Sequence, residues 1–128
     1  RFARAAGERD QKRVLAVQGL DGCDELPLKP VAATEFFDGE LRQVTLDPGD
    51  FGLSQRDHHP CESAEEAARI VEQNLRGQRE DQQDAIIYNA GVRLHLCERV
   101  GSINEGIERA RTVLASGQAA EKLSQLQN

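Results

Sequence analysis

Residues 31–47 read VAATEFFDGELRQVTLD, and this stretch decides the fold class. Two extended segments, Ala32–Phe37 and Leu41–Leu46, flank Asp38-Gly39-Glu40. Asp-Gly between two such segments is a strong signal for a β-hairpin, because both residues tolerate the positive φ angles of a tight turn. We therefore predict a pair of antiparallel strands here.

A further strand is predicted upstream of the hairpin. Val14-Leu15-Ala16-Val17 is a short, partly β-branched apolar run that stops at Gly19, as expected of a buried strand. Residues 19–25 follow with the sequence GLDGCDE, which contains two glycines and three carboxylates. This composition predicts a loop at the end of the strand.

The second half of the chain is predicted to be helical. Two capping boxes, Ser63 with Glu66 and Ser102 with Glu105, each start a helix. These two helices are expected to end at glycines, namely Gly77 and Gly117. The inward face of the first of them is predicted to carry four apolar residues: Ala67, Ile70, Val71 and Leu75.

Two more helices complete the prediction. Asp84 is expected to cap a buried helix over residues 85–98, and a short helix follows Gly117. Strands followed by about four helices indicate an α/β fold. Two or three strands are few for such a fold, so we expect residues 1–128 to be one portion of a larger α/β domain.

Charge and composition exclude several classes of function. The chain has 16 Lys and Arg against 22 Asp and Glu, a net charge of −6, which argues against general nucleic-acid binding. No apolar run approaches the roughly 20 residues that a membrane-spanning helix needs. The 3 cysteines are widely spaced and form neither a disulfide framework nor a zinc motif, so a reducing cytoplasm is the expected compartment.

The acidic loop is the sharpest chemical feature. Asp24 and Glu25 are adjacent like charges, with Asp21 nearby, and a hard divalent cation such as Mg²⁺ would relieve their repulsion. On spacing alone a solvated acidic turn is favoured, because Asp, Glu and Gly are common loop residues. The loop chemistry leaves both interpretations open, with Asp24 and Glu25 as candidate metal ligands and Asp21 as a weaker candidate.

Histidine and cysteine give weaker signals. The segment 57–61, DHHPC, lacks a second ligand pair for zinc, and His95 and Cys97 are expected on different faces of a helix. A nucleophilic Cys23 is not expected either, because the carboxylates around it would raise the pKa of its thiol. We interpret residues 57–61 as a loop and the segment with His95 and Cys97 as part of a packed helix.

In order and spacing, several stretches resemble the C-terminal part of the large α/β domain of anthranilate phosphoribosyltransferase. They are Val14-Leu15-Ala16-Val17-Gln18-Gly19, Gly22-Cys23-Asp24-Glu25-Leu26, Thr45-Leu46-Asp47-Pro48, Asp50-Phe51-Gly52-Leu53, Tyr88-Asn89-Ala90, and Ser116-Gly117 with Ala119. Each stretch is short, and the specificity lies in their combination from about residue 14 to near the end of the chain.

The resemblance implies a mixed-sheet phosphoribosyltransferase domain. Its family transfers a phosphoribosyl group from phosphoribosyl pyrophosphate to anthranilate, a step of tryptophan biosynthesis. The family's Asp-Glu pair, which holds Mg²⁺ for the pyrophosphate, falls on Asp24 and Glu25. For the complete enzyme the resemblance implies a cytoplasmic homodimer, with the phosphate loop and the dimerisation domain upstream of residue 1.

Some positions depart from the family pattern and leave alternatives open. Gln18 stands where the family commonly has His, Pro27 where it has Ser, and Pro60-Cys61-Glu62 where it has Gly-Gly-Asp. A paralogue with another acceptor or a nucleic-acid-binding role is one alternative. A non-catalytic α/β module is another.

Overall fold

The computed structural model describes residues 3, 13–19, 24–57, 60–79 and 82–127. Three strands form one sheet in the order β1-β2-β3: β1 is Arg13–Val17, β2 is Val31–Phe37 and β3 is Glu40–Leu46. Both pairings are antiparallel, with Val17 opposite Ala33 and Val31 opposite Leu46. The sequence also predicts a helix that ends near Gly7, and Gly7 lies outside the described residues.

The hairpin forms as predicted from its turn. Asp38 and Gly39 both have positive φ angles, 51° and 80°, which is the backbone geometry that matches the twist of the two strands. The outer strand β3 is exposed from Glu40 to Gln43, whereas Val31 and Ala33 of β2 are buried. The sheet therefore contributes to the core mainly through β2 and the end of β3.

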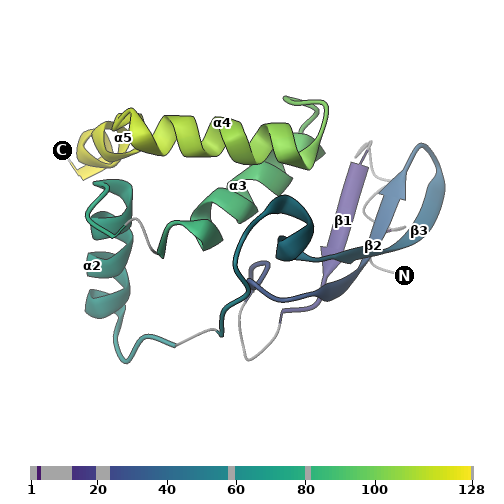
Figure 1. Ribbon diagram of the computed structural model, residues 1–128, viewed down its shortest axis with the longest axis horizontal. Helices are drawn as coiled ribbons and strands as arrows, with labels where there is room; N and C mark the ends of the chain where they lie inside the picture. Colours follow the sequence, from purple (N-terminus) through teal and green to yellow (C-terminus); the bar gives the residue numbers. More distant parts are fainter. Residues whose placement is uncertain (1–2, 4–12, 20–23, 58–59, 80–81, 128) are drawn as a thin grey trace.

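Four helices follow the sheet and a short 3₁₀ helix, η1, at Pro48–Phe51. They are α2 (Ala64–Leu75), α3 (Asp84–Leu96), α4 (Ile103–Ala115) and α5 (Gln118–Gln127). Figure 1 shows α3 and α4 between the sheet and α2, with α5 continuing the line of α4. The order of strands and helices confirms the predicted α/β class, and the three described strands are all antiparallel.

Both predicted capping boxes are present. The Ser63 and Ser102 hydroxyls accept hydrogen bonds from the backbone N–H groups of Glu66 and Glu105, each at 3.1 Å. The two glutamates reach back to the N–H groups of Glu62 and Gly101, each at 2.8 Å. These reciprocal bonds satisfy backbone donors that a helix start otherwise leaves unpaired.

Three details of the helix predictions are wrong. Asp84 is the first residue of α3 and not its cap, and Gln83 before it makes no capping hydrogen bond with its side chain. The helix ends at Leu96, because Glu98 adopts a left-handed conformation with φ 54°. Val71 is 48% exposed, since α2 packs through other residues, and the buried residue of α2 is Asn74.

The core lies between the sheet and the helix pair α3–α4. Its members are buried side chains from the loop after β1, from β2, β3 and the segment after η1, and from both helices: Leu26, Val31, Ala33, Leu46, Leu53, Ile87, Tyr88, Val92, Ile107, Ala110 and Leu114. Within the described residues, no helix combines the length and the apolar character needed to cross a membrane.

Candidate metal-binding site

Asp24 and Glu25 lie in the connection between β1 and β2, where both are exposed. The residue that follows them, Leu26, is 6% exposed and belongs to the core. The loop is thus fixed by an apolar side chain directly after its two carboxylates. Asp21, Gly22 and Cys23 lie outside the described residues, so the suggested role of Asp21 stays a prediction.

The buried side chain of Asn89, on α3, holds the backbone of this loop. Its Oδ1 accepts a hydrogen bond from the N–H of Leu26 at 3.0 Å, and its Nδ2 donates to the carbonyl oxygen of Leu26 at 2.9 Å. Nδ2 also donates to the carbonyl oxygen of Ala85 at 3.0 Å, one turn earlier in the helix. One amide group therefore links α3 to a residue 63 positions earlier in the chain.

Arg93 lies one turn after Asn89 and contacts Glu25. Its Nη2 donates to Oε1 of Glu25 at 2.9 Å, and the two side chains are 67% and 49% exposed. An exposed pair of this kind contributes about 0.2–1 kcal/mol, because water and salt screen it. Glu25 thus has a weak counter-charge from α3 in this structure.

The donors at this site favour a hard cation. Two adjacent carboxylates offer oxygen ligands, which suit Mg²⁺. Among the described residues there is no cluster of three or more His, Cys, Asp or Glu side chains arranged to hold a metal. A cation at Asp24 and Glu25 would therefore take its remaining ligands from water or from a bound phosphate, as Mg²⁺ commonly does.

A cavity of about 660 Å³ opens beside the acidic loop. Glu25, Asn89 and Arg93 contribute polar groups to its wall, and most of the rest is apolar. The apolar lining comes from the helices: Leu75, Ile86, Ala90, Leu94, Ala110, Val113, Leu114 and Ala119. The carboxylate of Glu25 thus borders a space large enough for a ligand.

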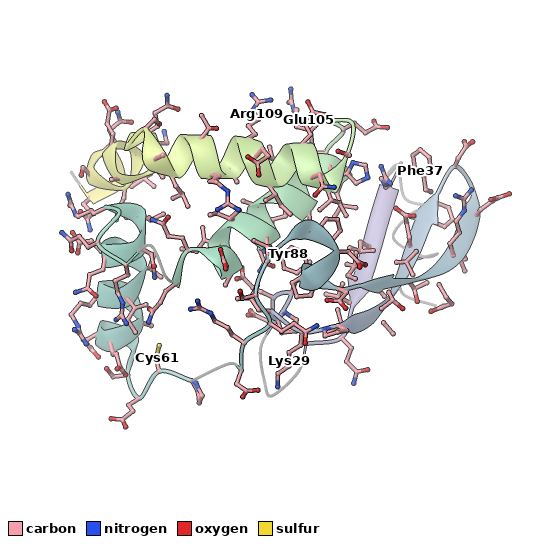
Figure 2. All side chains as sticks on the ribbon, in the orientation of Figure 1. Lys29, Phe37, Cys61, Tyr88, Glu105 and Arg109 are labelled. Carbon is pink, nitrogen blue, oxygen red and sulfur yellow. The ribbon has the colours of Figure 1, made fainter. Side chains whose placement is uncertain are left out.

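Of the histidine and cysteine candidates that the structure describes, His95 and Cys97 do not come together. His95 and Cys97 line two different cavities, as expected for residues two positions apart at the end of α3. Cys61 is a free, exposed thiol before α2 (Figure 2), and His58 and His59 lie outside the described residues. The described part of the chain thus provides no transition-metal site.

Sequence reasoning missed both Asn89 and Arg93. Asn89 was named only within Tyr88-Asn89-Ala90, one of the stretches that carry the family resemblance. The available signal was an amide side chain within an otherwise apolar helix, because a buried polar group needs a partner. The sequence could not show that this partner is the backbone of Leu26.

Strands, packed helices and an acidic loop fixed against one helix define the molecule as an α/β domain with a candidate cation-binding loop. Residues 1–120 match the family model described as "Glycosyl transferase family, a/b domain". The chain belongs to this family.

Similar proteins carry a more specific name. The anthranilate phosphoribosyltransferase of Thioalkalivibrio sulfidiphilus (strain HL-EbGR7) is 36% identical over 128 aligned positions, which cover 98% of this chain and 38% of that protein. The enzyme of the same name from Synechococcus elongatus is 37% identical over 126 positions, which cover 95% of this chain and 36% of that protein. The chain thus spans less than two-fifths of the length of these relatives.

Solved structures agree with the sequence comparison. The crystal structure of anthranilate phosphoribosyltransferase from Thermus thermophilus matches with a TM-score of 0.81 and 31% identity, covering 95% of this chain and 37% of that one. The Saccharomyces cerevisiae enzyme in complex with 4-fluoroanthranilate matches with a TM-score of 0.72 and 25% identity, and the match covers 88% of this chain and 34% of that one. These matches confirm the resemblance inferred from the sequence motifs.

Proposed function

We propose that this chain is the metal-loop part of a Mg²⁺-dependent phosphoribosyltransferase that acts on anthranilate in tryptophan biosynthesis. The names of the relatives support the reaction. The observation that carries the metal site is the exposed Asp24-Glu25 pair, which is fixed against α3 at Leu26 and of which Glu25 lines a cavity. For the complete protein we propose a homodimer in the cytoplasm, as the resemblance implies.

The residues present fit Mg²⁺ better than a structural metal. Two carboxylates with no third such ligand clustered beside them in the described part of the chain leave coordination positions for water and phosphate oxygens. When bound, Mg²⁺ would supply positive charge beside the departing pyrophosphate oxygens. Because both pyrophosphate and the loop are anionic, the loop can approach that leaving group only with a cation between them.

The chain's own residues have separate tasks in this proposal. Asp24 and Glu25 supply the oxygen ligands, and Leu26 anchors them to the core. Arg93 holds the Glu25 carboxylate when no cation is bound. Its hold is weak, so a cation at Glu25 displaces it at small cost.

The metal site is tested on the chain itself with Mn²⁺ as a spectroscopic substitute for Mg²⁺. Paramagnetic resonance should show bound Mn²⁺ that Mg²⁺ displaces. Asp24→Asn combined with Glu25→Gln should weaken Mn²⁺ binding by at least about 10–100-fold, the usual effect of disturbing a metal site.

A control variant separates the site from overall charge. Glu108→Gln combined with Glu121→Gln also removes two negative charges, but at exposed positions of α4 and α5. This variant should keep its Mn²⁺ affinity within about twofold of the wild type. Equal Mn²⁺ affinity in the wild type and the Asp24/Glu25 variant would refute the metal site.

The acceptor is tested by activity. A chimaera in which this chain replaces the matching part of the Thioalkalivibrio sulfidiphilus enzyme should consume anthranilate in the presence of phosphoribosyl pyrophosphate. The Asp24/Glu25 variant of the chimaera should lose most of its Mg²⁺-dependent turnover. A folded chimaera that ignores anthranilate but consumes phosphoribosyl pyrophosphate with another acceptor would support the paralogue instead.

A further inference from the structure

Helix α3 holds the acidic loop through Asn89, whose side-chain amide makes three hydrogen bonds. Asn89 is 7% exposed, and both hydrogens of its Nδ2 are used, one on Leu26 and one on Ala85. Its Oδ1 accepts from the N–H of the same Leu26. A primary amide is the side-chain group that can donate to and accept from one backbone residue in this way.

The bonds fix the residue next to the two carboxylates. Leu26 directly follows Glu25, so its N–H belongs to the peptide group that joins the two residues. Fixing that N–H and the Leu26 carbonyl restricts the orientation of the peptide plane from which the Glu25 side chain starts. Two residues further on, the carbonyl of Leu28 accepts from the N–H of Arg56 at 2.9 Å, which anchors the other side of Leu26.

Arg93 adds a second contact on the same face of α3. It lies four residues after Asn89, so the two side chains share one face of the helix. Asn89 contacts the backbone of the loop and Arg93 contacts the carboxylate of Glu25, at 2.9 Å. The backbone contact is buried and the carboxylate contact is exposed, so only the first can define the loop's position in water.

We propose that Asn89 is a positioning residue for the cation site: by holding Leu26 from both sides of its backbone, it directs the carboxylates of Asp24 and Glu25 to a common point. This inference rests on the proposed function, because it assigns Asn89 a role toward the Mg²⁺ that the loop would bind. Asn89 does not contact the cation; it acts through the loop.

The test compares two buried asparagines on different helices. Asn89→Ala removes the link to the loop. Asn74→Ala is the matched control, because Asn74 is 4% exposed and donates to Ile70 within its own helix. Both variants should lose stability, and a general loss of stability alone would affect the loop equally in the two.

Two measurements report the loop directly. Amide hydrogen exchange at Leu26 should be at least about 10-fold faster in Asn89→Ala, since a lost hydrogen bond of about 1.4 kcal/mol corresponds to that factor. Mn²⁺ affinity by paramagnetic resonance should fall about 10–100-fold. In Asn74→Ala both values should stay within about twofold of the wild type. If Asn89→Ala does not fold, Asn89→Ser is measured instead, with the same expectation.

The outcomes separate this inference from the proposed function. Wild type and folded Asn89→Ala with equal Mn²⁺ affinity would overturn the role of Asn89 and leave the metal site intact. A wild type that binds no Mn²⁺ at the loop would overturn the metal site and with it the role of Asn89 toward a cation. Equal losses of affinity in both asparagine variants would show a general effect of instability and overturn the inference as well.

Discussion

Tyr88 combines complete burial with a hydroxyl group that has no hydrogen-bond partner among the described residues. Its ring lies 5.9 Å from that of Phe51, centroid to centroid, between α3 and η1 (Figure 2). Burial, reinforced by the negative charges of Asp47 and Asp50, raises the pKa of Tyr88 from 10.0 to about 12. The folded state thus keeps a proton that the unfolded chain releases near pH 10.

This shift predicts a loss of stability in alkaline solution. The pKa is higher in the folded state, so the contribution of Tyr88 is complete below about pH 10 and disappears as the pH rises towards 12. Tyr88→Phe should remove this dependence. The hydroxyl is unpaired among the described residues. The free energy of unfolding of Tyr88→Phe at neutral pH should therefore equal that of the wild type or exceed it by up to about 1 kcal/mol.

Urea unfolding at several pH values between neutral and about pH 11 measures both effects. The difference in unfolding free energy between Tyr88→Phe and the wild type should grow above about pH 10. A constant difference across this range would contradict the raised pKa. A large loss of stability in Tyr88→Phe at neutral pH would show that the hydroxyl has a partner.

At the scale of elements, α3 and α4 approach each other through two glycines. A Cβ atom at Gly106 would lie 2.4 Å from the carbonyl oxygen of Gly91, and one at Gly91 would lie 2.7 Å from the backbone nitrogen of Ile107. Both distances are far below van der Waals contact, and the obstructing atoms are backbone. The crossing of the two helices therefore requires glycine at both positions.

Gly106→Ala should lower the free energy of unfolding by about 1–3 kcal/mol, the usual cost of overpacking, despite the better helix propensity of alanine. Gly101→Ala is the control, because its Cβ would meet only the Glu105 carboxylate at 3.4 Å, and it should change stability by less than about 0.5 kcal/mol. Urea unfolding of both variants checks the prediction. Gly106→Ala with unchanged stability would mean that the helices are farther apart than described.

Elements with local signals could be predicted from the sequence, and contacts between distant elements could not. The hairpin turn at Asp38-Gly39 and the capping residues Ser63 and Ser102 are confirmed because each acts within a few residues of itself. The end of α3 was missed because Glu98 takes the left-handed position that glycine usually marks. No local sequence pattern predicts that a glutamate will take this left-handed conformation.

In the candidate site, too, the local feature could be predicted from the sequence and the contacts between distant elements could not. Asp24 and Glu25 could be chosen because two adjacent carboxylates in a glycine-containing loop coincide with the Asp-Glu pair that the family resemblance implies, and their role as ligands stays a prediction. Asn89 and Arg93 could not be assigned to the loop, because 63 and 68 residues separate them from their partners. Pairing across such distances is set by the packing of α3 on the core, which sequence periodicity does not specify.

At the scale of the whole molecule, the cavity beside the acidic loop exposes apolar surface. It measures about 660 Å³ and is lined mainly by apolar side chains of α2, α3, α4 and α5. Apolar surface of this kind binds hydrophobic molecules when no protein segment covers it. The isolated chain should therefore bind the dye anilinonaphthalene sulfonate in its folded state, with an increase in fluorescence.

Two exposed apolar residues make the prediction specific to this cavity. Val113 on α4 lines it and is 36% exposed, whereas Leu126 on α5 is 74% exposed and does not line it. Val113→Gln should weaken dye binding severalfold, since a polar amide replaces part of the apolar wall. Leu126→Gln should leave the affinity unchanged, although it removes more exposed apolar surface. If the two variants weaken binding equally, the dye reports general apolar exposure and not this cavity.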